Sequence, residues 1–185
     1  MKLPIIAYGD PVLKKRATDI TKEYPKLDEL IANMYETMYA SKGVGLAAPQ
    51  IGLSIRLFVT DGSPFEEDEV LDFKQVFINP VIRDEEGELW KFNEGCLSIP
   101  NIREDIQRKE MLRIDYYDQN WNFKSETFKG LAARIIQHEY DHLEGVLFVD
   151  RISPLRRRLL KNKLTDISKG IVDVDYKMKF PSKAK

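Results

Sequence analysis

The chain of 185 residues carries 29 Lys and Arg against 30 Asp and Glu, a net charge of −1, and 43% of its residues are hydrophobic. This balance argues against a protein that binds DNA or RNA by neutralising phosphates, because such proteins present a strongly basic face. The hydrophobic content and the low net charge argue against a disordered chain, and a single cysteine rules out an intramolecular disulfide.

The sequence also argues against a membrane or secreted protein. No stretch approaches the roughly 18 consecutive apolar residues that a membrane span requires. The N-terminal sequence MKLPIIAYGDP is interrupted by Pro4 and has no apolar core of signal-peptide length. A lone cysteine fits a reducing compartment. We therefore expect a cytoplasmic protein that makes no membrane contact.

The first predicted elements are a helix over residues 25–42 and a buried strand over 55–60. Apolar side chains recur at helical spacing in the first segment, where Pro25 suits the first turn and Gly43 suits the end. The sequence IRLFVT is typical of a buried strand. The acidic, turn-rich sequence DGSPFEEDE that follows at 61–69 predicts an exposed loop.

Strand patterns occupy the middle of the chain. The segments 76–84 and 88–92 flank Glu-Glu-Gly at 85–87, which indicates a hairpin with its turn there. Alternating apolar and polar residues at 112–116 predict a further strand. A turn and a short strand over 123–128 follow it.

A second helical pattern precedes Gly145, which suits its end. Apolar and histidine side chains fall three or four residues apart at Phe128, Leu131, Ile135, His138 and His142.

A last helix begins after Ser153 and Pro154, an N-cap and first-turn pair. We expect Leu155, Leu159, Leu164 and Ile167 on one side of it, and Gly170 after its end.

Strands grouped between helices, rather than alternating with them, predict an α+β fold. We expect antiparallel strands packed around the central helix that carries both histidines, with helices near the N- and C-terminal ends. The length is that of one domain, which we assign to residues 1–170. Residues 171–185 form a C-terminal tail.

The strongest chemical signal is His138-Glu139-Tyr140-Asp141-His142, which contains both histidines of the chain. Residues four apart share a helix face, with Cβ atoms about 5–6 Å apart, so both imidazoles can bind one cation. Glu139 lies about 100° around the helix from His138, where its carboxylate can reach a water at that cation without ligating it. The alternative is a pair of surface histidines without a ligand.

A catalytic metal usually has three protein ligands, so two histidines leave one ligand to find. A third histidine is excluded, since the chain has only two, and no Glu follows Glu144. A downstream Asp (Asp150, Asp166, Asp173 or Asp175) remains an alternative, and the lone cysteine, Cys96, is the stronger candidate. A lone cysteine is otherwise most often a small buried hydrophobe.

A glycine-rich segment, GVGLAAPQIG at 43–52, forms a third cluster. Its small residues allow close backbone approach to a ligand, and the Gln50 amide is a neutral donor suited to an oxyanion. On its own, a glycine-rich segment is a weak signal, and a plain helix-to-strand connection is the more common explanation.

Taken together, GVGLAAPQ at 43–50, EGCLS at 94–98 and QHEYDHLEG at 137–145 resemble the three signature motifs of the peptide deformylase family. The similarity extends to LPIIAYGDPVLKK near the N-terminus and covers about residues 3–150. It implies a bacterial, cytoplasmic enzyme that removes the N-formyl group from the initiator methionine of nascent polypeptides and releases formate.

The resemblance implies a role for each matching residue. The metal ligands are Cys96, His138 and His142. The general base and acid is Glu139, and the oxyanion donors are Gln50 and the backbone N–H of Leu97. Gly45 pairs with the substrate backbone, and Val44, Phe92, Leu131 and Ile135 line the pocket for the methionine side chain. The implied metal is Fe²⁺, which Zn²⁺, Ni²⁺ or Co²⁺ can replace; nitrogen and sulfur ligands do not choose among them.

Two alternatives to this function remain. One is a metallopeptidase that cuts internal peptide bonds with the same His-Glu-x-x-His helix, although such enzymes take His, Glu or Asp as third ligand. The other is a non-catalytic domain with a structural metal, which would require a fourth protein ligand and would leave Glu139 without a purpose.

The last predicted helix, within 155–168, carries the basic residues Arg156, Arg157, Arg158, Lys161 and Lys163. A solvated surface is the usual explanation for such a cluster. A transient contact with the ribosome is the alternative, since a basic C-terminal helix makes that contact in some deformylases. We expect no specific DNA binding.

Overall fold

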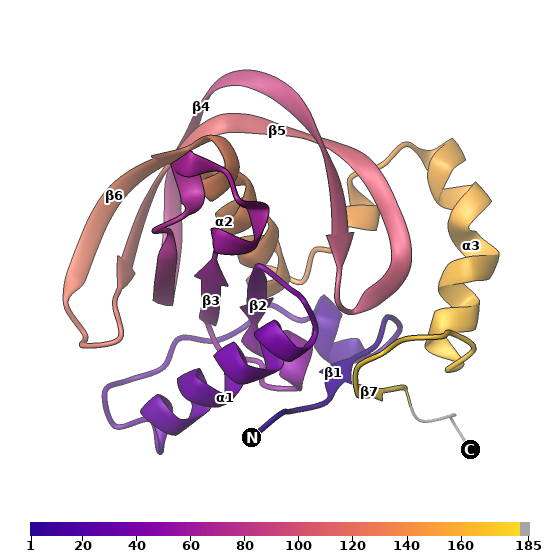
Figure 1. The fold of residues 1–185 in the computed structure, drawn as a ribbon, viewed down its shortest axis with the longest axis horizontal. Helices are drawn as coiled ribbons and strands as arrows, with labels where there is room; N and C mark the ends of the chain where they lie inside the picture. The colour runs from indigo at the N-terminus through magenta and orange to yellow at the C-terminus, as the bar shows by residue number, and fades with distance from the viewer. Residues whose placement is uncertain (182–185) are drawn as a thin grey trace.

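The computed structural model describes residues 1–181 and combines a mixed set of helices with an antiparallel sheet (Figure 1). The five-stranded sheet has the order β2-β3-β4-β5-β6, with antiparallel neighbours throughout. Its strands are β2 (Gly45–Ala47), β3 (Leu57–Asp61), β4 (Lys74–Cys96), β5 (Ile99–Tyr117) and β6 (Phe123–Lys129). These bounds confirm the predicted strands near 55–60, 112–116 and 123–128.

The two longest strands, β4 and β5, arch over the molecule as one long ribbon (Figure 1). The hairpin turn predicted at 85–87 is wrong, because β4 runs through it: Glu85 pairs with Leu112 and Glu86 with Met111 before a register shift to Leu89. Gly87 has φ of 84° at this irregularity. Glycine at positive φ occurs in β-bulges as well as in hairpin turns, so the Glu-Glu-Gly sequence alone does not distinguish the two. The chain reverses at 97–98, between Cys96 and Ile99.

The acidic segment 61–69 is exposed over most of its length, as predicted, but it is anchored at both ends. Asp61 is the buried last residue of β3, and two short 3-10 helices follow at Ser63–Phe65 and Asp68–Val70. Val70 is fully buried in a small cluster with Leu131 and Ala132. The loop therefore packs against the start of the histidine-bearing helix.

Two of the helices each contact several strands of the sheet. The first, α1 (Leu27–Ala40), buries Ile31, Met34 and Met38 in an apolar cluster with residues of β2, β3 and β4. The second, α2 (Gly130–Leu143), contacts β2, β3, β5 and β6 and lies beneath the β4–β5 arch (Figure 1). Phe128, expected in this helix, belongs to β6 instead.

The last two α-helices end just before the predicted glycines. Gly145 and Gly170 have φ of 73° and 77°, in the left-handed region that glycine occupies without steric cost.

The last helix, α3 (Pro154–Ser168), lies at the outside of the molecule (Figure 1). The Ser153 hydroxyl accepts a hydrogen bond from the Arg156 amide, as an N-cap does. Leu160, Leu164 and Ile167 are buried, but Leu155 and Leu159 are 65% and 62% exposed. The prediction of one apolar side is wrong for these two leucines, because around the helix Leu159 projects about 100° and Leu155 about 140° from Leu160.

Residues 171–181, assigned from the sequence to a tail, return to the N-terminal segment. Within them β7 (Met178–Lys179) pairs in parallel with β1 (Ile5–Ile6). The rest of the predicted tail, 182–185, lies outside the described residues. Across 1–181, none of the helices has the length and apolar character needed to cross a membrane.

Candidate metal centre

Three side chains from two elements converge beneath the arch. His138 and His142 lie one turn apart on α2, with ring centroids 5.2 Å apart. Cys96 is the last residue of β4, and its Sγ lies 3.4 Å from Nε2 of His142. One potential ligand atom from each residue lies within 4.8 Å of the other two. The structure thus brings together Cys96 and both histidines. None of the four downstream aspartates belongs to this cluster.

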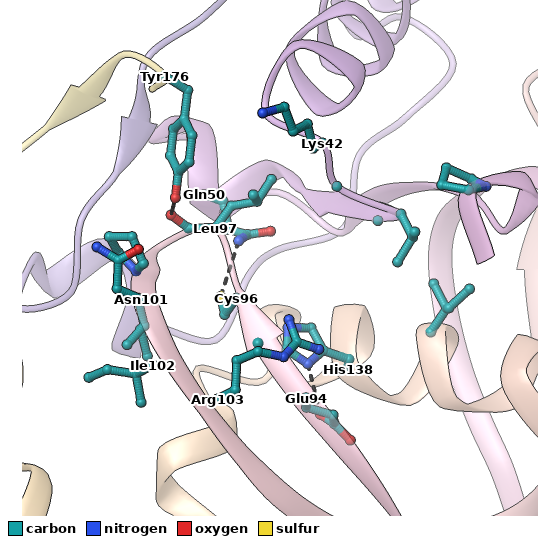
Figure 2. Close-up of a pocket in the computed structure, with 18 of the residues that line it drawn as sticks. Lys42, Gln50, Glu94, Cys96, Leu97, Asn101, Ile102, Arg103, His138 and Tyr176 are labelled. Carbon is teal, nitrogen blue, oxygen red and sulfur yellow. Dashed lines mark hydrogen bonds and ion pairs between the residues drawn. The ribbon is translucent and has the colours of Figure 1, made fainter. Parts of the chain in front are cut away.

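The orientation of His138 is set by a carboxylate behind it. Nδ1 of His138 lies 2.9 Å from Oε1 of Glu94, which leaves Nε2 facing the cluster (Figure 2). A ligating histidine typically donates its other ring nitrogen to such a partner, which fixes the tautomer and the ring plane. One nitrogen from each histidine and one sulfur are a donor set suited to Zn²⁺, Fe²⁺ or Ni²⁺, so the residues present fit a divalent transition metal.

Glu94 is the centre of a buried ion-pair network. It accepts two hydrogen bonds from Arg108, at 2.8 and 2.9 Å, and one from Arg134 at 2.8 Å. Burial opposes its ionisation, but the hydrogen bonds from Arg108 and His138 outweigh burial and hold the pKa of Glu94 well below its usual range. Arg108 also pairs with Asp141 of α2 at 2.8 Å. The network therefore joins β4, β5 and α2 directly behind the cluster.

Glu139 is buried beside the cluster, and its Oε2 has no hydrogen-bond partner among the described residues. Burial raises the pKa of Glu139 to about 7; the charge of His138 opposes this shift, and that of Glu94 adds to it. A buried, unpartnered carboxylate is available to bind and pass on a proton.

The glycine-rich segment supplies backbone next to Glu139. A Cβ on Gly45 would lie only 2.4 Å from Oε1 of Glu139, so this close approach requires glycine. Gly45 belongs to β2, which is at the edge of the five-stranded sheet and pairs with β3 alone in the described part of the chain. Its other edge is therefore open to an added strand.

Gln50 is buried at the end of a short 3-10 helix, Ala48–Ile51. Its Oε1 accepts the Ala47 amide at 2.9 Å, so its NH₂ group faces the cluster. That group lies 3.5 Å from Sγ of Cys96 (Figure 2) and 3.3 Å from the Ser98 hydroxyl.

A cavity of about 810 Å³ opens onto these groups. Of the predicted pocket residues, Val44, Gly45, Phe92 and Ile135 line it, together with Glu139, Gln50 and Leu97. The structure does not place Leu131 in its wall. Leu131 lies one helical turn before Ile135 and packs against Val70 of the 61–73 segment instead.

Several lining residues were missed from the sequence. Phe65 contacts Phe92 edge-on, with ring centroids 5.8 Å apart, although its loop was expected to be exposed. Residues 173–176 of the C-terminal segment line another part of the cavity. Both are brought there by long-range packing, and no local pattern signals it. Glu94, by contrast, is the first residue of the EGCLS motif at 94–98, so the sequence did mark its position.

A cysteine sulfur next to both histidines and the buried glutamate of a His-Glu-x-x-His helix defines the site of a metal-dependent hydrolase. The comparisons with known proteins specify the family. The polypeptide deformylase family model matches residues 2–158. The chain is 58% identical to a peptide deformylase of Christiangramia forsetii and 56% identical to one of Flavobacterium johnsoniae, over 100% of this chain and 99% of each relative.

A solved peptide deformylase from Thermotoga maritima is similar, at 43% identity and a TM-score of 0.75, over 83% of this chain and 99% of that one. The chain belongs to the polypeptide deformylase family. Its fold of mixed helices with an antiparallel sheet is the fold of this family.

Replacing Glu94 tests the network. We expect Glu94→Gln to lower the free energy of unfolding by about 3 kcal/mol, because the buried Arg134 loses its carboxylate partner and Arg108 keeps only Asp141, and to weaken metal binding about 10- to 100-fold. Chemical denaturation and competition with a chelator measure the two effects. Glu88→Gln is the control, since Glu88 is exposed on the same strand. A Glu94→Gln protein as stable and as metal-retentive as the control would contradict the role of the network.

Proposed function

We propose that the chain hydrolyses the N-formyl group of formylmethionine at the start of newly synthesised polypeptides, using Cys96, His138 and His142 as ligands of one divalent ion. The enzyme releases formate and leaves a free amino terminus. The observation that carries this assignment is the convergence of Cys96 with both histidines beside Glu139. We assign Fe²⁺ as the ion, with Zn²⁺, Ni²⁺ or Co²⁺ as substitutes, because all accept mixed nitrogen and sulfur ligands.

When bound there, the ion would polarise the formyl carbonyl and lower the pKa of water towards about 7. Glu139 takes a proton from the attacking water, since its Oε2 is buried and has no other partner in the described residues. The same carboxylic acid then delivers that proton to the leaving amine. Because Glu139 lies against Gly45, there is room for a formyl hydrogen but little for a bulkier acyl group.

The developing oxyanion is stabilised by two donors, the Gln50 NH₂ group and the Leu97 N–H. Gln50 is suited to this role because Ala47 occupies its oxygen and fixes its orientation. One such preorganised donor is typically worth about 3 kcal/mol of transition-state stabilisation.

The substrate lies along the open edge of β2, where the Gly45 backbone pairs with the peptide. Val44, Phe92 and Ile135 contact the methionine side chain in the adjoining part of the cavity. Leu131 does not line the cavity, so its effect on that pocket is indirect, through packing. In this arrangement α2 is a central metal-binding helix surrounded by antiparallel strands.

Nascent formylated chains are the protein substrate, and we place the reaction in the bacterial cytoplasm, where they are made. The basic residues of α3 are a candidate ribosome contact. Two of them are already paired within the molecule, Arg156 with Glu104 and Arg157 with Asp150 at 2.5 and 2.6 Å. Arg158, Lys161 and Lys163 are exposed and form no ion pair among the described residues.

The base assignment predicts the behaviour of a single variant. We expect Glu139→Gln to retain the bound metal but to lose at least about 100-fold in kcat for formate release from formyl-Met-Ala-Ser, because no other group replaces the base. Metal analysis and a formate assay measure the two quantities, with Glu88→Gln as control. A fully active Glu139→Gln protein would remove Glu139 from the mechanism.

The same assay distinguishes the alternative hydrolase. The wild-type enzyme should release formate and leave an internal peptide bond intact. Cleavage of the internal bond with the formyl group retained would identify a metallopeptidase instead.

Co-sedimentation tests the ribosome contact. Replacing Arg158, Lys161 and Lys163 with Glu should abolish co-sedimentation with ribosomes at low salt and leave activity on formyl-Met-Ala-Ser unchanged, because the helix lies outside the catalytic cavity. The matched control replaces three exposed basic residues outside this helix, Lys2, Lys22 and Lys26, with Glu. Unchanged co-sedimentation would leave these residues as a solvated surface.

A further inference from the structure

The C-terminal segment 171–181 runs along the mouth of the catalytic cavity, beyond the residues that the family model matches. It is attached on both sides of its cavity-lining part. The Asn101 amide donates to the carbonyl of Asp173 at 2.9 Å, and the amide of Ile5 donates to the carbonyl of Lys177 at 2.9 Å. The stretch between these attachments, 173–176, forms part of the cavity wall.

The segment also contacts the turn at 97–98, which carries the proposed oxyanion donor. These two residues lie between the ends of β4 and β5, so their carbonyls have no partner in the sheet ladder. The carbonyl of Ser98 accepts the amide of Tyr8 at 2.9 Å. The carbonyl of Leu97 accepts the hydroxyl of Tyr176 at 2.7 Å (Figure 2).

Tyr176 is well placed to hold this turn. Its ring is half-buried and packs, as the Leu97 side chain does, against the apolar cluster of α1 and β2. Figure 2 shows the ring extending from the C-terminal segment with its hydroxyl at Leu97. The Cys96 end of the turn is held by β4, so the hydrogen bond fixes the other end of Leu97.

We propose that Tyr176 is a positioning residue for deformylation: it holds the carbonyl of Leu97 so that the N–H of the same residue stays directed at the developing oxyanion. The inference rests on the proposed function of Leu97 as an oxyanion donor. An oxyanion donor acts only if it is already oriented when the charge develops, and a displacement of about 1 Å in a reacting geometry can cost up to about 100-fold in rate. The C-terminal segment is thus part of the catalytic domain in function.

Tyr176→Phe tests the proposal, because it removes one hydroxyl and keeps the ring in the cavity wall. We expect kcat for formyl-Met-Ala-Ser to fall about 5- to 10-fold while KM changes less than about twofold, since the oxyanion exists in the transition state and not in the bound substrate. Hydrogen exchange in the peptide covering 96–100 should become faster, with the metal content unchanged. The control is Tyr24→Phe, which removes a hydroxyl without a side-chain hydrogen bond in the described residues, from the same apolar cluster.

Two results would overturn the proposal. One is a Tyr176→Phe enzyme with the kcat of the wild type. The other is a loss of kcat that metal loss accounts for, or that the Tyr24→Phe enzyme shares. Failure of the proposed function is distinguishable from both, because in that case the wild-type enzyme itself would release no formate.

Discussion

The buried carboxylate of Glu94 accepts hydrogen bonds from His138, Arg108 and Arg134, and the geometry of the metal centre depends on this interaction. Each guanidinium group pays a desolvation penalty that only a fixed anion offsets. The carboxylate lies on β4, two residues before Cys96, so the strand that carries the proposed sulfur ligand also orients His138. Arg108 extends the same network to Asp141, on the helix between the two histidines. Charge pairing in the interior therefore sets the distance between a strand end and one helix face.

Backbone groups help to position the side chains of the proposed mechanism. Oε1 of Glu139 lies so close to Gly45 that a Cβ there would clash with it. The amide of Ala47 donates to Oε1 of Gln50, which leaves the Gln50 NH₂ group facing the cavity. Backbone groups in a sheet move little, so the proposed base and oxyanion donor are oriented before substrate binds, as electrostatic preorganisation requires. The edge position of β2 provides a binding mode for an extended peptide, because its free backbone groups can pair with an added strand. In the proposed mechanism, one short strand therefore positions both Glu139 and the substrate.

The sequence predicted the features of the site that lie within one helix or one motif, and it missed those that depend on long-range packing. The spacing of His138, Glu139 and His142 is a property of one helix, so it could be predicted directly. Spacing alone does not exclude the downstream aspartates in favour of Cys96, because the distance between a strand end and a helix has no local signal. Only the three motifs taken together indicate the cysteine. The sequence predicts a turn at Gly87 where the structure has a β-bulge, because both features favour glycine at positive φ. The contributions of Phe65 and Tyr176 depend on where distant segments pack, and Arg108 is separated from Glu94 by a chain reversal.

X-ray absorption spectroscopy of the zinc-loaded enzyme tests the three proposed metal ligands most directly, because it identifies the atoms around the ion independently of activity. A shell with one sulfur at about 2.3 Å and imidazole nitrogens at about 2.0–2.1 Å is the result expected for Cys96, His138 and His142 as ligands. Cys96→Ser should remove the sulfur component from that shell. A wild-type spectrum with only nitrogen and oxygen neighbours would contradict the assignment of Cys96, and with it the arrangement on which the mechanism is built.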